Sequence, residues 1–593
     1  MHEFTNDENS PMVLATTSIQ ETWGKDEKIL FIDEGCLKFS HKNIWRDLDF
    51  SVLKSLWKDT KQNKVDSLYL NQLNEILLER LSVALNIQHD KSYSVKYWRI
   101  LIGAWLKFFI HIYYDRWKTI TYVDEHYKNI KMYTLVSDSS ALLPNDTGNF
   151  FDLVSTDIWN EYIYHDIAKK WTNIKIQKLG GVNLQQVSFK NRINLKSTAI
   201  RIFLEIFHKF KYKSSYKYRN SKYFIYYPYL NFKSRLQLNL KLKNSLVRFH
   251  KHSCPISNID TNFRNWNITK KGDDLFLTAI TEIIPHMLPK CFLEGYEKLI
   301  TFNTNWPVSP KVIMTANAFA TDPIWSAWVA NLVEKGSKLV IAQHGGVYGT
   351  FDSYSFFDYE LSIADKYITW GWIDQDSKTI LKGPAVKLIN LKRRNKNLGK
   401  KCLLVLVSDS RYSRDLKFNL PTKDMPNYLN DQFRFAKSLA KNVQKELQVR
   451  LYEDYFEWNT KERWEEELPS IELVNYNVGF DKILSDTKLC VCTYNSTTFL
   501  ETFTRNIPTV IHWNQDANQL NSKAQYYFDL LHKVSILHYT PEGCAEFINS
   551  IWDDIPGWWN SVQVRQAVTK FSNNFANVGP NPISKLHSIL TDW

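Results

Sequence analysis

The sequence lacks the marks of secretion, of membrane insertion and of cysteine-based metal or disulfide sites. Its N-terminus, MHEFTNDENSP, is acidic and polar, unlike a signal peptide. The longest apolar stretch, residues 97–114, is interrupted by Arg99, Lys107 and His111, which favours a buried amphipathic helix over a membrane span. The seven cysteines show no paired metal spacing. We therefore expect a cytoplasmic protein with reduced thiols.

Several common catalytic motifs are missing as well. There is no HExxH motif, no P-loop and no GxSxG turn. Asp47-Leu48-Asp49 has the letters of a metal-binding DxD motif, but it precedes an apolar helical pattern instead of ending a strand. The sequence therefore predicts a reaction without metal or cofactor, in which cationic side chains and helix dipoles stabilise a departing phosphate.

Acidic residues are nearly absent from one region. Residues 169–251 contain 20 Lys or Arg and a single acidic residue, Glu205, in a chain whose net charge is +13. The region is also rich in Tyr and Phe, which suits an anionic partner such as a membrane surface or a lipid-linked phosphate acceptor. A solvated insertion is the alternative. No recognition motif for nucleic acid is present, so we expect no nucleic-acid partner.

Apolar segments of strand length alternate with helical patterns along the chain. This alternation predicts parallel sheets that are covered by helices on both faces. The basic stretch KRRNKNLGKK separates two such groups of strands. Strands are expected at residues 28–32, 311–314, 338–342, 366–369, 401–407, 449–452 and 509–512, and at LCVC from residue 489.

These features predict an α/β protein with two Rossmann-like domains that face a cleft, which is the layout of GT-B glycosyltransferases. A basic helical insertion, residues 169–251, is expected in the N-terminal domain. Open α/β sheets bind ligands at the carboxyl ends of their strands, so the site is expected there. The predicted parts are a polar tail (1–27), an N-terminal acceptor-side domain (28–386), a basic linker (387–400) and a C-terminal nucleotide-binding domain ending in helices (401–593).

The segment from residue 489 to 514 predicts a strand, a polar turn, a helix and a second strand. Backbone N–H groups and hydroxyls at a helix N-terminus suit a phosphate. Glu501, one turn into this helix, is placed to accept both hydroxyls of a ribose. Thr498 to Glu501 also forms a capping-box pattern, which is the structural alternative. The predicted nucleotide ligands of this unit are Thr493, Asn495, Ser496, Thr497, Thr498 and Glu501.

Gln343-His344-Gly345-Gly346 directly follows a predicted buried strand. His344 is placed to act as general base on an acceptor hydroxyl or as a cation beside a phosphate. Gly345 and Gly346 leave room for a ligand near the backbone. The alternative is a histidine held by the backbone of a tight turn.

Further candidates follow other predicted strands. Arg411 and Arg450, the latter near Tyr452, are placed to contact nucleotide phosphates, although surface ion pairs would explain them too. Asp33 and Glu34 end the first predicted strand, and one of them is a candidate base for an inverting transferase. A helix N-cap or a solvated loop is the alternative for these two carboxylates.

A resemblance to a known family is carried by QHGGVYGT, ADKYITWGW, the SRYS loop, VRLYEDYFEW, TYNSTTFLETFTRNIPTVIHWN and IWDDIPGWWNSVQVRQA. These segments resemble transferases encoded in bacterial surface-carbohydrate loci. KILFIDEGC and KYWRILIGAWLKFFIHIYYDRW resemble the N-terminal part of that family, so the likeness covers about residues 28–575, with the basic segment least alike. HGG ahead of ADKYIT is also similar to CDP-glycerol glycerophosphotransferases and capsule Kdo transferases.

The resemblance implies roles for particular residues. His344 would serve as base or phosphate contact, and Ser496, Thr497 and Glu501 would hold the nucleotide. Where the family reads Gly-Glu-Trp-Cys, this chain reads Asp33-Glu34-Gly35-Cys36, so the glutamate is retained and the tryptophan is missing.

We therefore expect a metal-independent transferase that moves a sugar from a nucleotide donor to a bacterial surface-glycan acceptor. The sugar is expected to be an acidic one, such as a nonulosonic acid or Kdo. The acceptor, a glycan or a lipid-linked molecule, would bind the N-terminal domain and the basic segment, at the inner face of the cytoplasmic membrane. The alternatives are a CDP-polyol phosphotransferase and a non-catalytic nucleotide-sugar-binding or membrane-scaffold protein.

Overall fold

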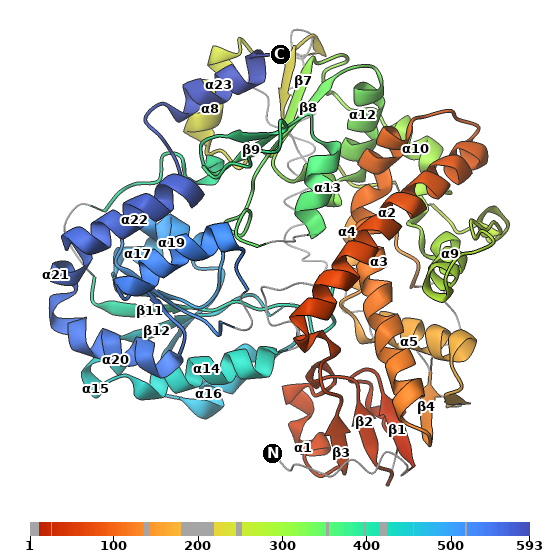
Figure 1. Cartoon of the computed structure of the whole chain (residues 1–593), viewed down its shortest axis with the longest axis horizontal. Helices are drawn as coiled ribbons and strands as arrows, with labels where there is room; N and C mark the ends of the chain where they lie inside the picture. The colour runs from red at the N-terminus through yellow and green to blue at the C-terminus, as the bar shows by residue number, and fades with distance from the viewer. Residues whose placement is uncertain are drawn as a thin grey trace, which may run out of the picture.

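The computed structural model is an α/β protein whose described strands form three parallel sheets, named here A, B and C (Figure 1). The predicted α/β class with parallel sheets is confirmed. The predicted N-terminal domain, residues 28–386, contributes to two separate sheets instead of one. The structure describes residues 11–24, 26–135, 142–179, 219–244, 252–255, 257–351, 355–394, 399–414, 424–454, 456–515 and 519–593.

Sheet A has the strand order β3-β2-β1-β4-β5 and begins inside the segment expected to be a polar tail, residues 1–27. Its central strand β1 consists of four buried residues, Met12–Ala15. The tail prediction was wrong here, because a run of four apolar residues between polar ones is too short to show a period. The other strands are β2 (Ile29–Phe31), β3 (Phe50–Val52), β4 (Ile130–Thr134) and β5 (Lys175–Lys178).

Sheet B has the order β10-β9-β8-β7-β6, so each strand pairs with the next one along the chain. Helices α12 and α13 cover one face, and α8 and the C-terminal helix α23 cover the other. Helix α23 thus packs on sheet B, although its residues lie in the predicted C-terminal domain. The elements are β6 (Tyr223–Ile225), β7 (Val312–Thr315), β8 (Lys338–Ala342), β9 (Lys366–Thr369), β10 (Ile380–Lys382), α8 (Phe232–Lys241), α12 (Pro323–Glu334), α13 (Ser355–Ile363) and α23 (Pro582–Thr591).

Sheets A and B share one core through the long helix α3 (Val95–His126), which pairs with α2 (Thr60–His89). Helix α3 packs on α5 (Asp157–Trp171) beside sheet A and on α12 and α13 beside sheet B. At Gly103 a Cβ would lie 2.6 Å from the ring of Tyr359. Most of α3 is buried, which confirms the predicted buried helix. Among the described helices, none combines the length and apolarity that crossing a membrane requires.

Sheet C has the order β13-β12-β11-β14-β15-β16, the doubly wound arrangement whose strand order reverses between β11 and β14. Side chains of β14 alternate, so Leu489 and Val491 pack under α14 and α20, whereas Cys490 and Cys492 pack under α18 and α22. The strands are β11 (Lys401–Val405), β12 (Leu447–Arg450), β13 (Glu472–Val474), β14 (Thr487–Cys492), β15 (Thr509–His512) and β16 (Leu537–His538). The helices are α14 (Met425–Ser438), α18 (Thr497–Thr504), α20 (Pro541–Ile551) and α22 (Val562–Phe575).

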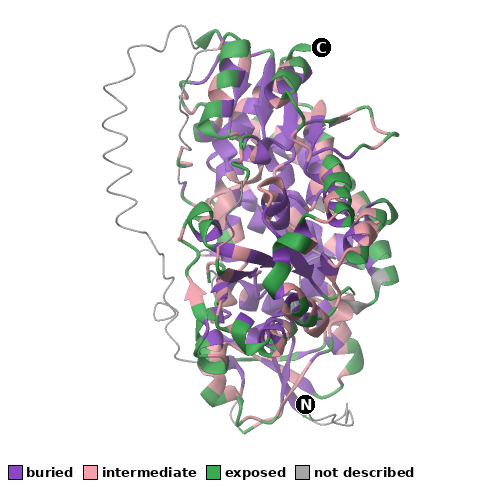
Figure 2. Cartoon of the chain, turned by 90° about the vertical axis from the view of Figure 1, so that its left-hand side faces the viewer, coloured by how far each residue is buried: buried purple, intermediate pink, exposed green. Residues whose placement is uncertain are grey.

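Two parts of the basic segment 169–251 are described, residues 169–179 and 219–244. The helical insertion was expected over the whole segment, of which residues 180–218 and 245–251 lie outside the described residues, as do residues 395–398 of the expected linker. The described parts include β5 at the edge of sheet A and β6 at the edge of sheet B, followed by α8. The segment therefore connects two sheets. Figure 2 shows the buried strands within the molecule and exposed residues on the outer helices.

Candidate functional site

The loop that follows β8 contacts the start of α18, which joins the two motifs singled out in the sequence. The N–H of Gly346 donates to Thr497 Oγ1 at 3.0 Å. A Cβ on Gly346 would lie 2.8 Å from the carbonyl of Ser496, so only glycine fits this contact. Gly345 differs, because a Cβ there would meet only the Tyr348 ring at 3.6 Å and Thr497 Oγ1 at 4.0 Å. We call this contact the B–C junction.

The turn after β14 lies at the point where the strand order of sheet C reverses. The hydroxyl of Thr493 donates to the carbonyl of Val405 at 2.9 Å and lies 2.6 Å from the hydroxyl of Tyr428. Thr493 therefore holds the ends of β11 and β14 together, and its predicted ligand role is not supported. Asn495 donates to Thr350 Oγ1 at 3.1 Å, and its Oδ1 is buried without a partner among the described residues.

Helix α18 begins without a side-chain cap. Ser496 occupies the N-cap position, but no side chain there accepts a hydrogen bond from the first turn. The capping box predicted from Thr498 and Glu501 does not form, because Thr498 Oγ1 lies 3.1 Å from the Tyr494 hydroxyl and Glu501 has an ion-pair partner. The side chain of Ser496 therefore does not compete with an anion for the first N–H groups of α18.

His344 lies above a buried carboxyl. Its ring nitrogens are each 3.2 Å from the hydroxyl of Tyr348, which donates to Glu360 Oε1 at 2.5 Å. The distance from His344 Nδ1 to Glu360 Oε1 is 3.8 Å. Tyr367 of β9 also acts on Glu360 and lowers its pKa, against the larger effect of burial. Glu360 and Tyr348 were not among the sequence candidates, because nothing in the sequence places α13 under the loop after β8.

Burial shifts the pKa of both titratable groups in this cluster. Burial and the nearby charge of Lys387 lower the pKa of His344 to about 4, although a hydrogen bond to Ala316 opposes the shift. Burial raises the pKa of Glu360 to about 8. Near pH 7 the imidazole is therefore neutral and can accept a proton.

Lys387 lies between His344 and Glu501. Its Nζ is 3.0 Å from Glu501 Oε1, and its charge acts on His344. It belongs to the short helix Val386–Leu388, and the Lys387 side chain is 37% exposed. From the sequence, this lysine was predicted only as the first residue of the basic linker. The structure makes it the cation of the B–C junction.

Arg411 is buried between sheets A and C. Its five N–H donors are all used: Nε contacts the carbonyl of Phe456, Nη1 the carbonyl of Gly35 and Asp157, and Nη2 Asp157 and Glu457. A guanidinium with every donor occupied has none to offer a nucleotide phosphate. The predicted phosphate role of Arg411 is therefore replaced by a structural one, at what we call the A–C junction.

Asp33 and Glu34 also lie at the A–C junction, whereas His344 lies at the B–C junction. Asp33 accepts a hydrogen bond from Gly35 N at 2.7 Å and caps a short 3-10 helix, as the structural alternative predicted. The charge of Glu34 acts on Arg463 of α16 (Thr460–Glu467), a helix between β12 and β13 of sheet C. The candidate role of these two carboxylates as catalytic base stays a prediction, at a different junction from His344.

Arg450 and Tyr452 lie at the end of β12, beside the turn before α18. Arg450 donates to the carbonyl of Tyr476 at 3.1 Å, and its guanidinium lies 5.2 Å from the centre of the Phe480 ring. Tyr452 is 44% exposed. Both act electrostatically on Tyr494, so they border the turn, although neither is shown in contact with its hydroxyls.

Tyr229 is a further residue that the sequence analysis did not identify. Its ring is nearly parallel to that of His344, with 6.2 Å between their centres. Its hydroxyl accepts a hydrogen bond from Asn317 at 2.9 Å. The backbone of Tyr229 has φ of +56°, an unfavourable conformation for a bulky residue that is found at functional sites. Tyr229 is 40% exposed and lies four residues after β6, the edge strand of sheet B.

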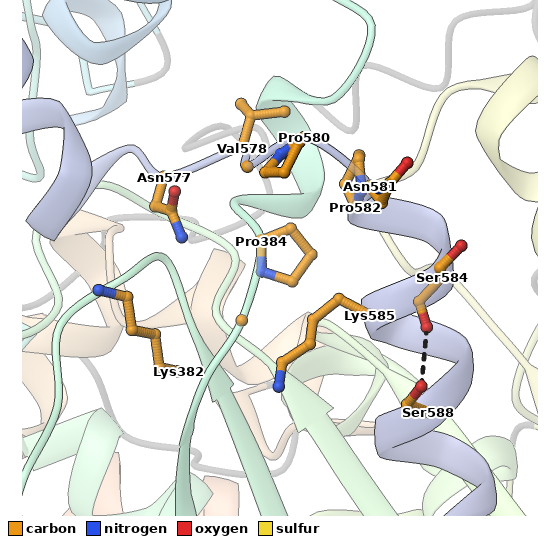
Figure 3. A pocket seen from close by; sticks show the side chains of 12 residues that line it. Lys382, Pro384, Asn577, Val578, Pro580, Asn581, Pro582, Ser584, Lys585 and Ser588 are labelled. Carbon is orange, nitrogen blue, oxygen red and sulfur yellow. Dashed lines mark hydrogen bonds between the residues drawn. The ribbon is translucent and has the colours of Figure 1, made fainter.

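A separate hollow of about 530 Å³ lies between the end of β10 and the start of α23 (Figure 3). Lys382 and Lys585 border it, and none of the candidate site residues lines it. Within the described ranges, no group of three or more His, Cys, Asp or Glu is arranged to hold a metal ion.

Comparison with solved structures finds remote likenesses. MurG from Acinetobacter baumannii is 12% identical, with a TM-score of 0.27, and the match covers 48% of this chain and 74% of that one. WaaG, a glycosyltransferase involved in lipopolysaccharide biosynthesis, is 10% identical, with a TM-score of 0.27, over 63% of this chain and 100% of that one. At these scores we draw nothing from either likeness.

Comparison of the sequence itself is more decisive. No protein of curated function matches the chain. A family model described as LIC12162 family transferase matches residues 12–590, which is nearly the whole chain. The protein therefore belongs to the LIC12162 family of transferases.

Proposed function

We propose that this transferase is a GT-B-type glycosyltransferase that moves a sugar from a nucleotide donor to a surface-glycan acceptor. The observation that carries the proposal is the contact between Gly346 and Thr497, which sets His344 beside an uncapped helix N-terminus. The donor would bind sheet C, and the acceptor would bind the edge of sheet B. An acidic sugar such as a nonulosonic acid or Kdo remains the preferred donor group.

The donor phosphate would lie at the start of α18. Backbone N–H groups there, the hydroxyls of Ser496 and Thr498, and the lack of any close contact at Gly345 support this position. Glu501 would bind the ribose hydroxyls. Its present partner, Lys387, would then be released to the phosphate and would take the role that the sequence analysis gave to the arginines.

The chemical step would use His344 as base. As the acceptor oxygen attacks the anomeric carbon, its proton passes to the neutral imidazole, and the bond from that carbon to the phosphate oxygen breaks. The α18 N-terminus and Lys387 would stabilise the departing phosphate. Glu360, which accepts a hydrogen bond from Tyr348, would position the His344 ring through that hydroxyl.

Thermal unfolding with CMP, CDP, UDP and GDP tests the proposal first. A bound nucleotide raises the melting temperature, and we expect one of the four to do so. Glu501→Ala should remove that shift, whereas Glu546→Ala on the exposed face of α20 should keep it. If no nucleotide shifts the wild-type protein, the proposed function fails.

Donor hydrolysis and transfer are then measured with CMP-sugars and with CDP-glycerol. His344→Ala should bind the nucleotide as the wild type does and lose turnover, and full turnover in this variant would remove His344 as the base. Reaction with CDP-glycerol would select the CDP-polyol phosphotransferase instead. Nucleotide binding without turnover of any donor would select a non-catalytic binding protein.

A further inference from the structure

We propose that the outer face of α8 docks on an anionic lipid membrane. The face is small and carries both apolar and basic side chains, and it lies beside the acceptor edge of sheet B. That a docked membrane delivers a lipid-linked acceptor to His344 rests on the proposed function, whereas the docking itself does not.

Helix α8 is apolar on two opposite sides. Leu238 and Leu242 are buried against sheet B and α23. On the other side, Phe232 is 70% exposed and Leu240 is 63% exposed. They are eight residues apart and so share one side of the helix. The inner side explains how α8 is held, and the outer side is left without a partner among the described residues.

The charge around this outer face has one sign. Residues 219–244 contain six Lys or Arg and no Asp or Glu. Lys233 and Lys241 are exposed on α8 itself, and Lys243 is exposed just after it. Apolar side chains bordered by lysines are the pattern of helices that lie in the interface of anionic bilayers.

Helix α2 also has an exposed apolar face, but the charges around it differ from those around α8. Val83 is 62% exposed and Ile87 is 73% exposed, so its outer face is at least as apolar as that of α8. Exposed Glu75 and Glu79 lie on the same helix surface. An anionic membrane would repel these carboxylates and attract the lysines of α8.

The docking face is tied to the candidate site by short connections. Helix α8 begins at Phe232, three residues after Tyr229, whose ring lies beside that of His344. Asn231, the N-cap of α8, donates to the carbonyl of Ile389 at 2.8 Å. Ile389 lies two residues after Lys387. A membrane under α8 would therefore lie next to the edge where an acceptor must enter.

Co-sedimentation of the full chain with lipid vesicles tests the docking. Vesicles of phosphatidylcholine are compared with vesicles that also contain phosphatidylglycerol. We expect binding only to the second kind, weakened by salt. Phe232→Ser with Leu240→Ser, and separately Lys233→Glu with Lys241→Glu, should each weaken it at least about tenfold.

The matched control is Val83→Ser with Ile87→Ser on α2, which should bind the vesicles as the wild type does. Unchanged binding in both α8 variants, or loss in the α2 control, would overturn the proposal. The proposal would also be overturned if the wild-type protein did not bind the vesicles, or if it bound tRNA and not the vesicles. Circular dichroism and melting temperature confirm that each variant is folded.

The nucleotide shift is measured on the same samples and should persist in the α8 variants. Vesicle binding that depends on α8, without any nucleotide shift, would keep the docking and reject the proposed function. A nucleotide-induced rise in melting temperature without vesicle binding would reject the docking and keep the proposed function.

Discussion

Among the described residues, the A–C and B–C junctions join sheet C to the two other sheets, and the polar groups at these two junctions are used differently. At the A–C junction, Arg411 and Lys38 pair with Asp157 and Glu457, and every donor of the arginine is occupied. At the B–C junction, by contrast, α18 starts without a cap and Lys387 is partly exposed. The first junction is complete without a ligand, whereas the second keeps polar groups that a ligand can use.

Both junctions nevertheless rely on the same device, a glycine pressed against backbone across the interface. A Cβ on Gly35 would lie 2.5 Å from the carbonyl oxygen of Arg411, and one on Gly346 would lie 2.8 Å from that of Ser496. Close backbone approach is therefore not what distinguishes a site. The difference is whether the charged and polar groups around the contact are already satisfied, and this can be tested one junction at a time.

The largest effect is expected from Arg411→Met at the A–C junction. The substitution leaves the carboxylate of Asp157 buried with Lys38 as its remaining cation, and breaking a buried pair costs about 3–5 kcal/mol. Urea unfolding measures the loss. Arg450→Met, which removes an arginine at the end of β12 without a buried carboxylate partner, should cost no more than about 1 kcal/mol. Equal losses would contradict the special role of Arg411.

Arg411 also shows what the sequence could not supply. Its partner Asp157 lies 254 residues earlier, so only the folded chain shows whether the arginine binds phosphate or joins two sheets. The parallel sheets were predictable, because buried strands such as LCVC are continuous apolar runs bounded by turn residues. Which strands share a sheet was not, because strand and helix alternate in the same way in one sheet or two.

As with the sheets, the local parts of the candidate site were predictable from the sequence and their tertiary neighbours were not. His344, Gly346, Thr497 and Glu501 follow strands or begin a helix, and such positions are local features of the sequence. Lys387 and Glu360 come to the site through tertiary packing, and their neighbours in sequence give no sign of it. Local sequence features therefore predicted the loop after β8 and the start of α18 as parts of the site. They did not predict Lys387 and Glu360, which add a cation and a buried carboxyl to it.

A second prediction uses the opposite pKa shifts of the two junctions. Although burial opposes it, Arg411 and Lys38 hold the pKa of Asp157 well below its usual range. Asp157 therefore stabilises the fold above its unfolded pKa, and this contribution is lost as pH falls through its folded pKa. Burial raises the pKa of Glu360 to about 8, so its contribution is lost as pH rises from the unfolded value of 4.5 towards 8.

Glu360→Gln tests the predicted direction in which the stability changes with pH. Between pH 5 and pH 7 the wild type should lose about 2–3 kcal/mol more unfolding free energy than the variant, because only the wild type must keep a proton on a buried carboxyl. Urea unfolding at the two pH values gives the difference, in which the other titrating groups cancel. Parallel pH profiles of the two proteins would contradict the raised pKa.

The smallest expected effect on stability comes from Gly346→Ala, and it bears most directly on the B–C junction. The added methyl group must displace the backbone at Ser496, which costs about 1–3 kcal/mol and moves the start of α18 away from His344. Gly345→Ala is the matched control, since its methyl group meets nothing closer than 3.6 Å. Stability should fall in the first variant only.

Nucleotide binding, measured by the thermal shift, should fall in both, because the methyl group at residue 345 enters the space left for the phosphate. Gly345→Ala with unchanged nucleotide binding would move the phosphate away from this loop, and Gly346→Ala with unchanged stability would show that the junction can open at no cost.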